Sequence, residues 1–174
     1  DESESQEMRP LLDATLGPDA SAPLRVALLV LVTSLIDDVN ALRGVLGEPE
    51  EVLSAHTWRN GMAQTSLTRF AGDVRAVMTW ISVPEVAHYQ EQLRFVSPER
   101  RVTLTFPSPY LRHAPTPLSI ERMDGGSHVQ ERHTVSYEEA FRSELHHFRG
   151  AVLQGKAPSP GVEEALGDTR WIEM

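Results

Sequence analysis

The chain has 174 residues, of which 40% are apolar, enough for one domain with a hydrophobic core. Lys and Arg number 16 against 25 Asp and Glu, so the formal net charge of −9 argues against a nucleic-acid partner. Cysteine is absent, which excludes disulfides and thiolate metal sites and fits a reducing cytoplasm, where we expect the protein. The longest apolar run, residues 26–32, is too short to cross a bilayer, so we expect no membrane partner.

The first part of the chain alternates polar and apolar stretches. Residues 1–7 are acidic without periodicity and predict a frayed end. Residues 18–23 collect Pro, Asp, Ser and Ala, which is typical of a loop. The run 26–32 fits either a strand buried on both faces or the base of the next helix.

Residues 33–46 predict an amphipathic helix, the most informative segment of the chain. Its apolar residues recur at the spacing that places them on one inward face, namely Leu35, Val39, Leu42, Val45 and Leu46. Thr33 or Ser34 can cap the N-terminus, and Asp37 and Asp38 lie in the first turn, where carboxylates favour the positive end of the helix dipole. Gly47 supplies the left-handed stop before Pro49.

The middle of the chain predicts a meander of strands, and therefore a predominantly antiparallel or mixed open sheet in an α+β fold. We expect strands at residues 51–59, 64–70, 74–83, 89–96, 101–106, 118–123 and 129–135. In the fifth of these, Val102, Leu104 and Phe106 alternate with polar residues, so one face meets solvent or a partner. Residues 107–117 contain four prolines and predict a loop.

Two helices are expected after the sheet. The first spans residues 137–153, starts with a capping box of Ser136 and Glu139, and has an apolar stripe that we expect to be buried. That stripe consists of Tyr137, Phe141, Leu145, Phe148 and Val152. The second helix is expected to start with Ser159 as its cap and Pro160 at its first position.

The helix 33–46 resembles the helix that opens the C-terminal domain of the glucose-fructose oxidoreductase, inositol dehydrogenase and MocA family (Gfo/Idh/MocA). Members read Asp-x-x-x-His-x-x-Asp-Leu-Leu-Arg-x-Leu-Leu-Gly-Glu-Pro before a strand. The matching residues here are Arg43, Leu46, Gly47, Glu48 and Pro49.

Three further segments resemble this family and occur in its order. Residues 9–17 are similar to its linking helix, and the following apolar run would be the strand that enters the second domain. Residues 137–148 are similar to its Tyr-x-x-Glu-Leu-x-x-Phe helix, followed by Gly155 to Pro158. Residues 161–171 are similar to its closing helix, which carries Ala165 and Asp168.

The resemblance implies a dihydrodipicolinate-reductase-like C-terminal domain, with helices packed on one face of its sheet. Residues 1–22 would be a linker and the remnant of the interdomain helix, and 23–174 the substrate-binding and oligomerisation domain. No Gly-x-Gly-x-x-Gly follows a strand, so we expect neither a Rossmann domain nor a cofactor site in this chain. NAD or NADP is implied only for the intact protein. We expect a piece of a longer enzyme, or a naturally reduced protein, that is inactive alone in hydride transfer.

The family's opening helix contributes an Asp and a His to the active site, four residues apart on one helix face. The corresponding positions are Thr33 and Asp37, and a later family Asp corresponds to Asn40. A carboxylate with its ordinary pKa of about 4 is a weaker base than imidazole at neutral pH. Two interpretations remain open. In the first, Asp37 is the proton acceptor of a divergent dehydrogenase, and Asn40 or Arg43 orients the substrate. In the second, the site has lost this chemistry, and Asp37 is only a first-turn carboxylate.

The histidines do not predict a metal site. His128 and His133 are five residues apart and point to opposite faces of a continuous strand. His113, in the proline-rich loop, is either a contact for a polar ligand or exposed loop decoration.

The resemblance implies the substrate-binding and dimerisation half of an NAD(P)-dependent oxidoreductase that acts on a sugar, polyol or related hydroxy compound. A homodimer or higher homo-oligomer through the sheet face is implied in the same way. One alternative is a non-enzymatic ligand-binding or dimerisation module that uses the same sheet without a cofactor. Another is an unrelated α+β domain that shares only the Gly-Glu-Pro helix end. The sequence alone identifies neither the substrate nor the choice between NAD and NADP.

Overall fold

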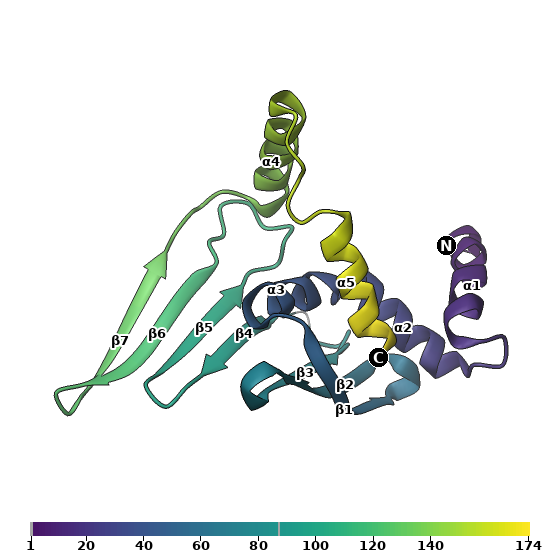
Figure 1. Cartoon of the computed structure of the whole chain (residues 1–174), viewed down its shortest axis with the longest axis horizontal. Helices are drawn as coiled ribbons and strands as arrows, with labels where there is room; N and C mark the ends of the chain where they lie inside the picture. Colours follow the sequence, from purple (N-terminus) through teal and green to yellow (C-terminus); the bar gives the residue numbers. More distant parts are fainter. Residues whose placement is uncertain (1, 87) are drawn as a thin grey trace. The chain divides into compact units, whose positions relative to one another are not determined.

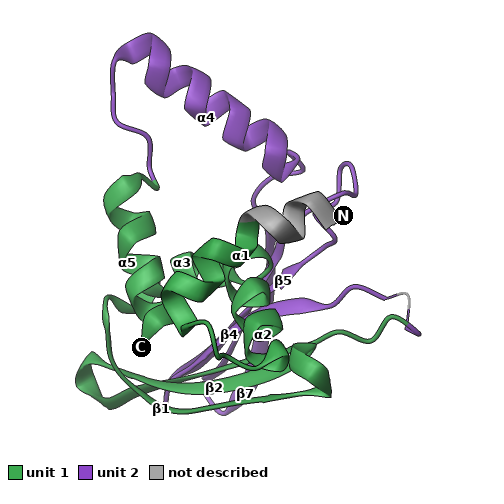
Figure 2. Ribbon diagram, turned by 90° about the vertical axis from the view of Figure 1, so that its right-hand side faces the viewer, with its two compact units in different colours: residues 1–84, 160–174 green, residues 85–159 purple. Residues whose placement is uncertain are grey.

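The computed structural model describes residues 2–86 and 88–174, with side chains from residue 8 onward. Contacts within the chain divide it into two compact units, residues 1–84 with 160–174 and residues 85–159 (Figure 2).

The first unit combines four helices with a three-stranded sheet (Figure 1). The helices are α1 (Glu2–Leu16), α2 (Ala22–Thr33), α3 (Ile36–Leu46) and α5 (Val162–Glu173). The strands are β1 (Pro49–Trp58), β2 (Ala63–Phe70) and β3 (Val74–Ile81), joined by the short 3₁₀ turns η1 (Arg59–Gly61) and η2 (Ala71–Asp73). They pair antiparallel in the order β1-β2-β3, so each connection is a short reversal.

The core of the first unit lies between the sheet and its helices. Phe70 of β2 and Trp171 of α5 pack edge to face, with ring centroids 5.3 Å apart and planes at 90°. Val39 of α3 completes this buried cluster. The Trp171 Nε1–H donates to Thr68 Oγ1 at 3.3 Å, so the buried indole retains a hydrogen-bond partner. One face of the sheet is therefore covered by helices.

The second unit contains a four-stranded sheet and one helix. Its strands are β4 (Glu91–Val96), β5 (Arg100–Phe106), β6 (Pro117–Asp124) and β7 (Ser127–Thr134), paired antiparallel in chain order. In this register Val102 and Leu104 lie opposite Ile120 and Leu118, so these apolar residues of β5 and β6 share one face of the sheet. Exposure does not alternate along β5, because residues 102–106 are all half-buried. The helix α4 (Ala140–Gln154) follows the sheet.

The predicted α+β fold with antiparallel strands is confirmed, and all seven predicted strands are present. The strands form two sheets of consecutive strands. Hairpin order follows from turn residues that reverse the chain within a few positions, such as Gly125 and Gly126 between β6 and β7, both at positive φ.

The strand expected for residues 26–32 is wrong, because these residues lie in α2. A short all-apolar run does not distinguish a buried strand from a buried helix. Pro23 at the start of α2 favours the helix, and Ala27, Leu28 and Val30 are buried along it. The frayed end predicted for residues 1–7 lies outside the residues whose side chains the structure describes, so it stays a prediction. α2 has 12 residues, and no helix in the described parts of the chain is long and apolar enough to cross a membrane.

The helix predicted from residue 33 begins at Ile36. Neither predicted cap is present, because Thr33 ends α2 and donates its hydroxyl to the Leu29 carbonyl at 2.7 Å, while Ser34 is the C-cap of α2. The predicted stop is confirmed, since Gly47 ends α3 with φ at 82°. Val45 is 64% exposed, so its predicted burial is wrong.

The last two helices also begin later than expected. α4 starts at Ala140, and the Ser136 hydroxyl accepts the Glu138 N–H outside the helix. α5 starts after Gly161, whose N–H donates to the Glu164 carboxylate at 2.9 Å, so Ser159 is not its cap. The expected burial of the α4 stripe is wrong, because all five side chains are exposed: Tyr137, Phe141, Leu145, Phe148 and Val152. Helical periodicity predicts an apolar face but not what covers it.

Candidate functional site

Thr33 and Asp37 do not share a helix. The chain breaks between α2 and α3, where Leu35 has φ −113° and ψ 0°. Thr33 is exposed at the end of α2, and Asp37 is exposed in the first turn of α3. The expectation that a four-residue spacing puts both side chains on one helix face is therefore wrong for this chain. Among the described residues, no donor bonds the Asp37 carboxylate.

Asn40 and Arg43 meet on one carboxylate, that of Asp168 in α5. Asn40 Nδ2 donates to Asp168 Oδ2 at 2.9 Å, and Arg43 Nη1 donates to Oδ1 at 2.5 Å. The Asp168 side chain is 4% exposed and that of Arg43 is 9% exposed, so this ion pair is buried. Two residues that the sequence proposes for substrate binding thus hold α3 against α5.

The guanidinium of Arg43 is bound on every side. Its Nη1 also donates to the Glu164 carbonyl at 2.7 Å, and its Nε and Nη2 form a two-point bond to the Glu48 carboxylate at 3.1 and 2.5 Å. The hydrogen bond that Arg43 donates to the Glu48 carboxylate raises the pKa of Arg43 above its ordinary value. The same bond lowers the pKa of Glu48 below its ordinary 4.5. Arg43 is therefore a fixed cation with four of its five N–H donors already used.

Gly167 makes room for this guanidinium. A Cβ built on Gly167 would lie 1.8 Å from Nη2 of Arg43 and 2.3 Å from its Cζ, so no larger residue fits without moving Arg43. The sequence marks Asp168 as a landmark of the resemblance without indicating its partner, and it does not single out Gly167. The one available sign in the sequence is a glycine directly before an acidic residue inside a predicted helix.

His113, the remaining candidate, belongs to the second unit. It lies in the loop between β5 and β6, is exposed and has φ at 55°, a conformation that residues other than glycine rarely adopt. In the same loop the ring of Tyr110 lies 6.2 Å from that of Phe141 in α4. His113 and the α3 residues are in different units. Among the described residues, no group of three or more His, Cys, Asp or Glu side chains is placed to hold a metal ion.

Comparison with known proteins supports the fold. No protein-family model matches the sequence, and no curated protein matches it. Solved structures of KijD10, a 3-ketoreductase from Actinomadura kijaniata, are similar in fold. The complex with NADP and TDP-benzene has a TM-score of 0.64 and 18% identity, covering 82% of this chain and 43% of that chain.

Two further KijD10 structures give the same result. The open conformation with TDP-benzene and NADP has a TM-score of 0.60 at 19% identity, covering 79% of this chain and 43% of that chain. The complex with NADP has a TM-score of 0.59 at 18% identity, covering 76% of this chain and 42% of that chain. The chain therefore spans less than half the length of the structures it matches. The architecture of this chain is that of one part of KijD10.

Proposed function

We propose that this chain is the C-terminal, substrate-binding and dimerisation domain of an NAD(P)-dependent oxidoreductase of the Gfo/Idh/MocA family. Its substrate would be a sugar, polyol or related hydroxy compound, and its compartment the cytoplasm. The observation that carries the proposal is the similarity in fold to KijD10, which is solved as a 3-ketoreductase with NADP and TDP-benzene. Residues 1–22 would be the linker from the cofactor domain and 23–174 the substrate domain.

The chain does not itself fit a nicotinamide cofactor. It has no Gly-x-Gly-x-x-Gly, and the connections within its sheets join antiparallel strands rather than a strand to a helix N-terminus. The cofactor site of the proposed enzyme would therefore be formed by residues outside this sequence.

Asp37 is the residue that we propose for proton transfer. It lies on the exposed side of α3 at the position of the family histidine, and no described donor holds its carboxylate. A carboxylate within hydrogen-bond distance of a substrate hydroxyl can accept its proton. Thr33, on a different helix, would take no part in positioning it.

Asn40 and Arg43 support the site indirectly in this proposal. Both donate to Asp168, so they fix the orientation of α3 and hence of Asp37. Direct contact of Asn40, Arg43 or His113 with a substrate stays a prediction.

A homodimer through the sheet is part of the proposal. The face of β1-β2-β3 opposite the helices exposes Trp58, Val77 and Ile81, at 41%, 71% and 48%. Exposed apolar side chains on one sheet face favour burial against a second copy. Sedimentation over a wide concentration range tests this, and a chain that stays monomeric throughout contradicts it.

The test of activity uses the natural gene product that contains this sequence. Reduction of NAD⁺ and NADP⁺ is measured with a panel of sugars and polyols, for the wild type, Asp37→Asn and the loop control Asp19→Asn. We expect turnover with one cofactor, a loss of at least about tenfold in Asp37→Asn, and no change in the control. Turnover that is unchanged in Asp37→Asn contradicts the role of Asp37. A gene product that binds neither cofactor favours the alternative, a non-enzymatic ligand-binding or dimerisation module.

A further inference from the structure

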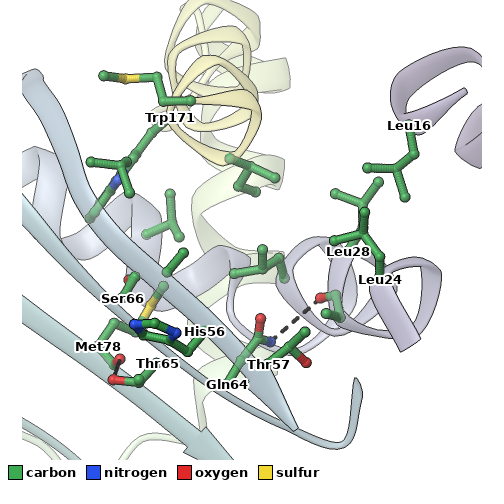
Figure 3. A pocket seen from close by; sticks show the side chains of 17 residues that line it. Leu16, Leu24, Leu28, His56, Thr57, Gln64, Thr65, Ser66, Met78 and Trp171 are labelled. Atoms are coloured by element: carbon green, nitrogen blue, oxygen red, sulfur yellow. Dashed lines mark hydrogen bonds between the residues drawn. The ribbon is translucent and has the colours of Figure 1, made fainter. Parts of the chain in front are cut away.

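A cavity of about 270 Å³ lies between α2 and the helix-covered face of the sheet in the first unit (Figure 3). Its walls come from α1, α2, α3, α5 and the three strands. Most of the lining is apolar, including Leu24, Leu28, Val39, Met78, Trp171 and Ile172. All of these residues belong to the first unit, so the cavity is formed within one compact body.

The side chains of the residues that line the cavity carry no permanent charge. None of these residues is Asp, Glu, Lys or Arg, and His56 is the one among them with a titratable side chain. An ionised ligand would lose its hydration without gaining a counter-charge, which costs several kcal/mol or more. The lining side chains therefore favour a neutral occupant.

One buried amide faces this apolar space. Gln64 of β2 is 9% exposed, and its Nε2 donates to the Ala27 carbonyl at the long distance of 3.5 Å (Figure 3). Among the described residues, no donor bonds the Gln64 Oε1. Thr57 and Thr65 are also among the lining residues, and their hydroxyls already donate to backbone carbonyls of the sheet. Gln64 Oε1 is thus an acceptor available to a ligand.

The volume matches a small organic molecule. An engineered apolar cavity of about 150 Å³ in another protein binds benzene, and ordinary ligand pockets begin near 300 Å³. A volume of about 270 Å³ suits one or two fused rings or a short branched chain.

From these observations we propose that this cavity is a binding site for a neutral, mainly apolar small molecule with one hydrogen-bond donor, which Gln64 Oε1 accepts. The site is separate from the exposed Asp37 carboxylate and needs no nicotinamide cofactor. It goes beyond the function proposed above, and its test gives a result whether or not the oxidoreductase assay succeeds.

The experiment titrates the 174-residue chain with indole and with indene, which has the same bicyclic shape but no N–H donor. Binding is followed by isothermal calorimetry and by the ¹H–¹⁵N cross-peaks, with the Trp171 indole as an internal reporter because it lines the cavity. We expect saturable binding of both, with indole about three- to tenfold tighter, the effect of one net hydrogen bond. Indole-3-carboxylate, which is charged, should not bind.

Ala55→Leu is designed to fill the cavity, and Gln64→Leu removes its polar group. Ala55→Leu adds a branched side chain to the lining, while Ala71→Leu makes the same change at an exposed position in η2 outside it. We expect Ala55→Leu to weaken indole binding at least about tenfold and Ala71→Leu to leave it unchanged. In Gln64→Leu, the preference of indole over indene should disappear. Circular dichroism and the thermal midpoint establish that each variant is folded.

Several results would overturn the proposal. The first is absence of saturable binding of either compound to the wild type. The second is equal binding to Ala55→Leu and wild type, which would place the compounds elsewhere on the surface. Equal affinity for indole and indene in the wild type would remove the role of Gln64. Self-association that indole reverses would identify the occupant as a second copy of the chain.

Discussion

Arg43 and Asp168 are 125 residues apart in the sequence, yet their side chains form the buried ion pair that joins α3 to α5. A buried pair is costly to desolvate, and it is maintained only when further hydrogen bonds satisfy both groups. Here Asn40 donates to the second carboxylate oxygen, and Glu48 and the Glu164 carbonyl accept three further guanidinium donors. The helix that ends the sequence is thereby fixed to the helix that carries Asp37.

Asp168→Asn should lower the free energy of unfolding by about 3 kcal/mol, because it leaves Arg43 without its buried counter-charge. Urea unfolding followed by tryptophan fluorescence measures this loss. Asp19→Asn, in an exposed loop, is the control and should change stability by less than about 0.5 kcal/mol. Equal stability of the two variants would mean that Glu48 alone satisfies Arg43.

Gly167→Ala should destabilise the protein, because the new Cβ would lie 1.8 Å from Nη2 of Arg43 and must push the guanidinium away from Asp168. The matched control is Gly44→Ala in α3, where nothing lies within 4 Å of the added Cβ. Alanine has the higher helix propensity, so the control should gain up to about 1 kcal/mol. Thermal unfolding of both variants checks the opposite signs, and a stabilised Gly167→Ala would refute the packing described here.

Thr68→Val should cost about 1–2 kcal/mol, because Trp171 Nε1–H loses its hydrogen-bond acceptor in the core while the side-chain shape is nearly kept. Denaturant unfolding measures the loss. The control is Thr79→Val, which replaces the same side chain at an exposed position of β3 that has no buried hydrogen-bond partner. If both changes have the same effect, the hydrogen bond to Trp171 contributes nothing.

The strands could be predicted because two local patterns agree along them. In β5 the alternation of Val102 and Leu104 with polar residues identifies one face, and the glycines after β6 mark the reversal. Residues 26–32 lack such a pattern, so the choice between helix and strand depends on the surrounding packing. The stripe of α4 shows the same limit, because its period predicts a helix face but its burial depends on a partner that the sequence does not specify.

The candidate site could be predicted only as a set of positions on one helix. The sequence places Asn40 and Arg43 on the polar side of α3, but it does not show that both donate to Asp168. Such long-range pairs depend on how α3 and α5 cross, which is decided by Val39, Phe70 and Trp171 in the core. The break at Ser34 and Leu35 is equally invisible, since both residues are compatible with one continuous helix.

Stability should depend on pH through Glu48. The bond from Arg43 holds the pKa of Glu48 below 4.5 in the folded protein, so folding favours the ionised carboxylate. This contribution is fully present above the ordinary pKa, and it is lost as pH falls through the lowered folded value. Glu48→Gln should therefore be less stable than wild type at pH 7, and the difference should vanish in acid.

Urea unfolding of wild type and Glu48→Gln at a series of pH values between about 7 and 3 measures this difference. Because the Glu48 side chain is 71% exposed, salt should reduce the difference at pH 7. The control is Glu163→Gln, which removes an acidic charge at an exposed position in the first turn of α5. A stability difference for Glu48→Gln that stays constant from neutral to acidic pH would contradict the pairing. Without the pairing, folding does not favour the ionised form of Glu48.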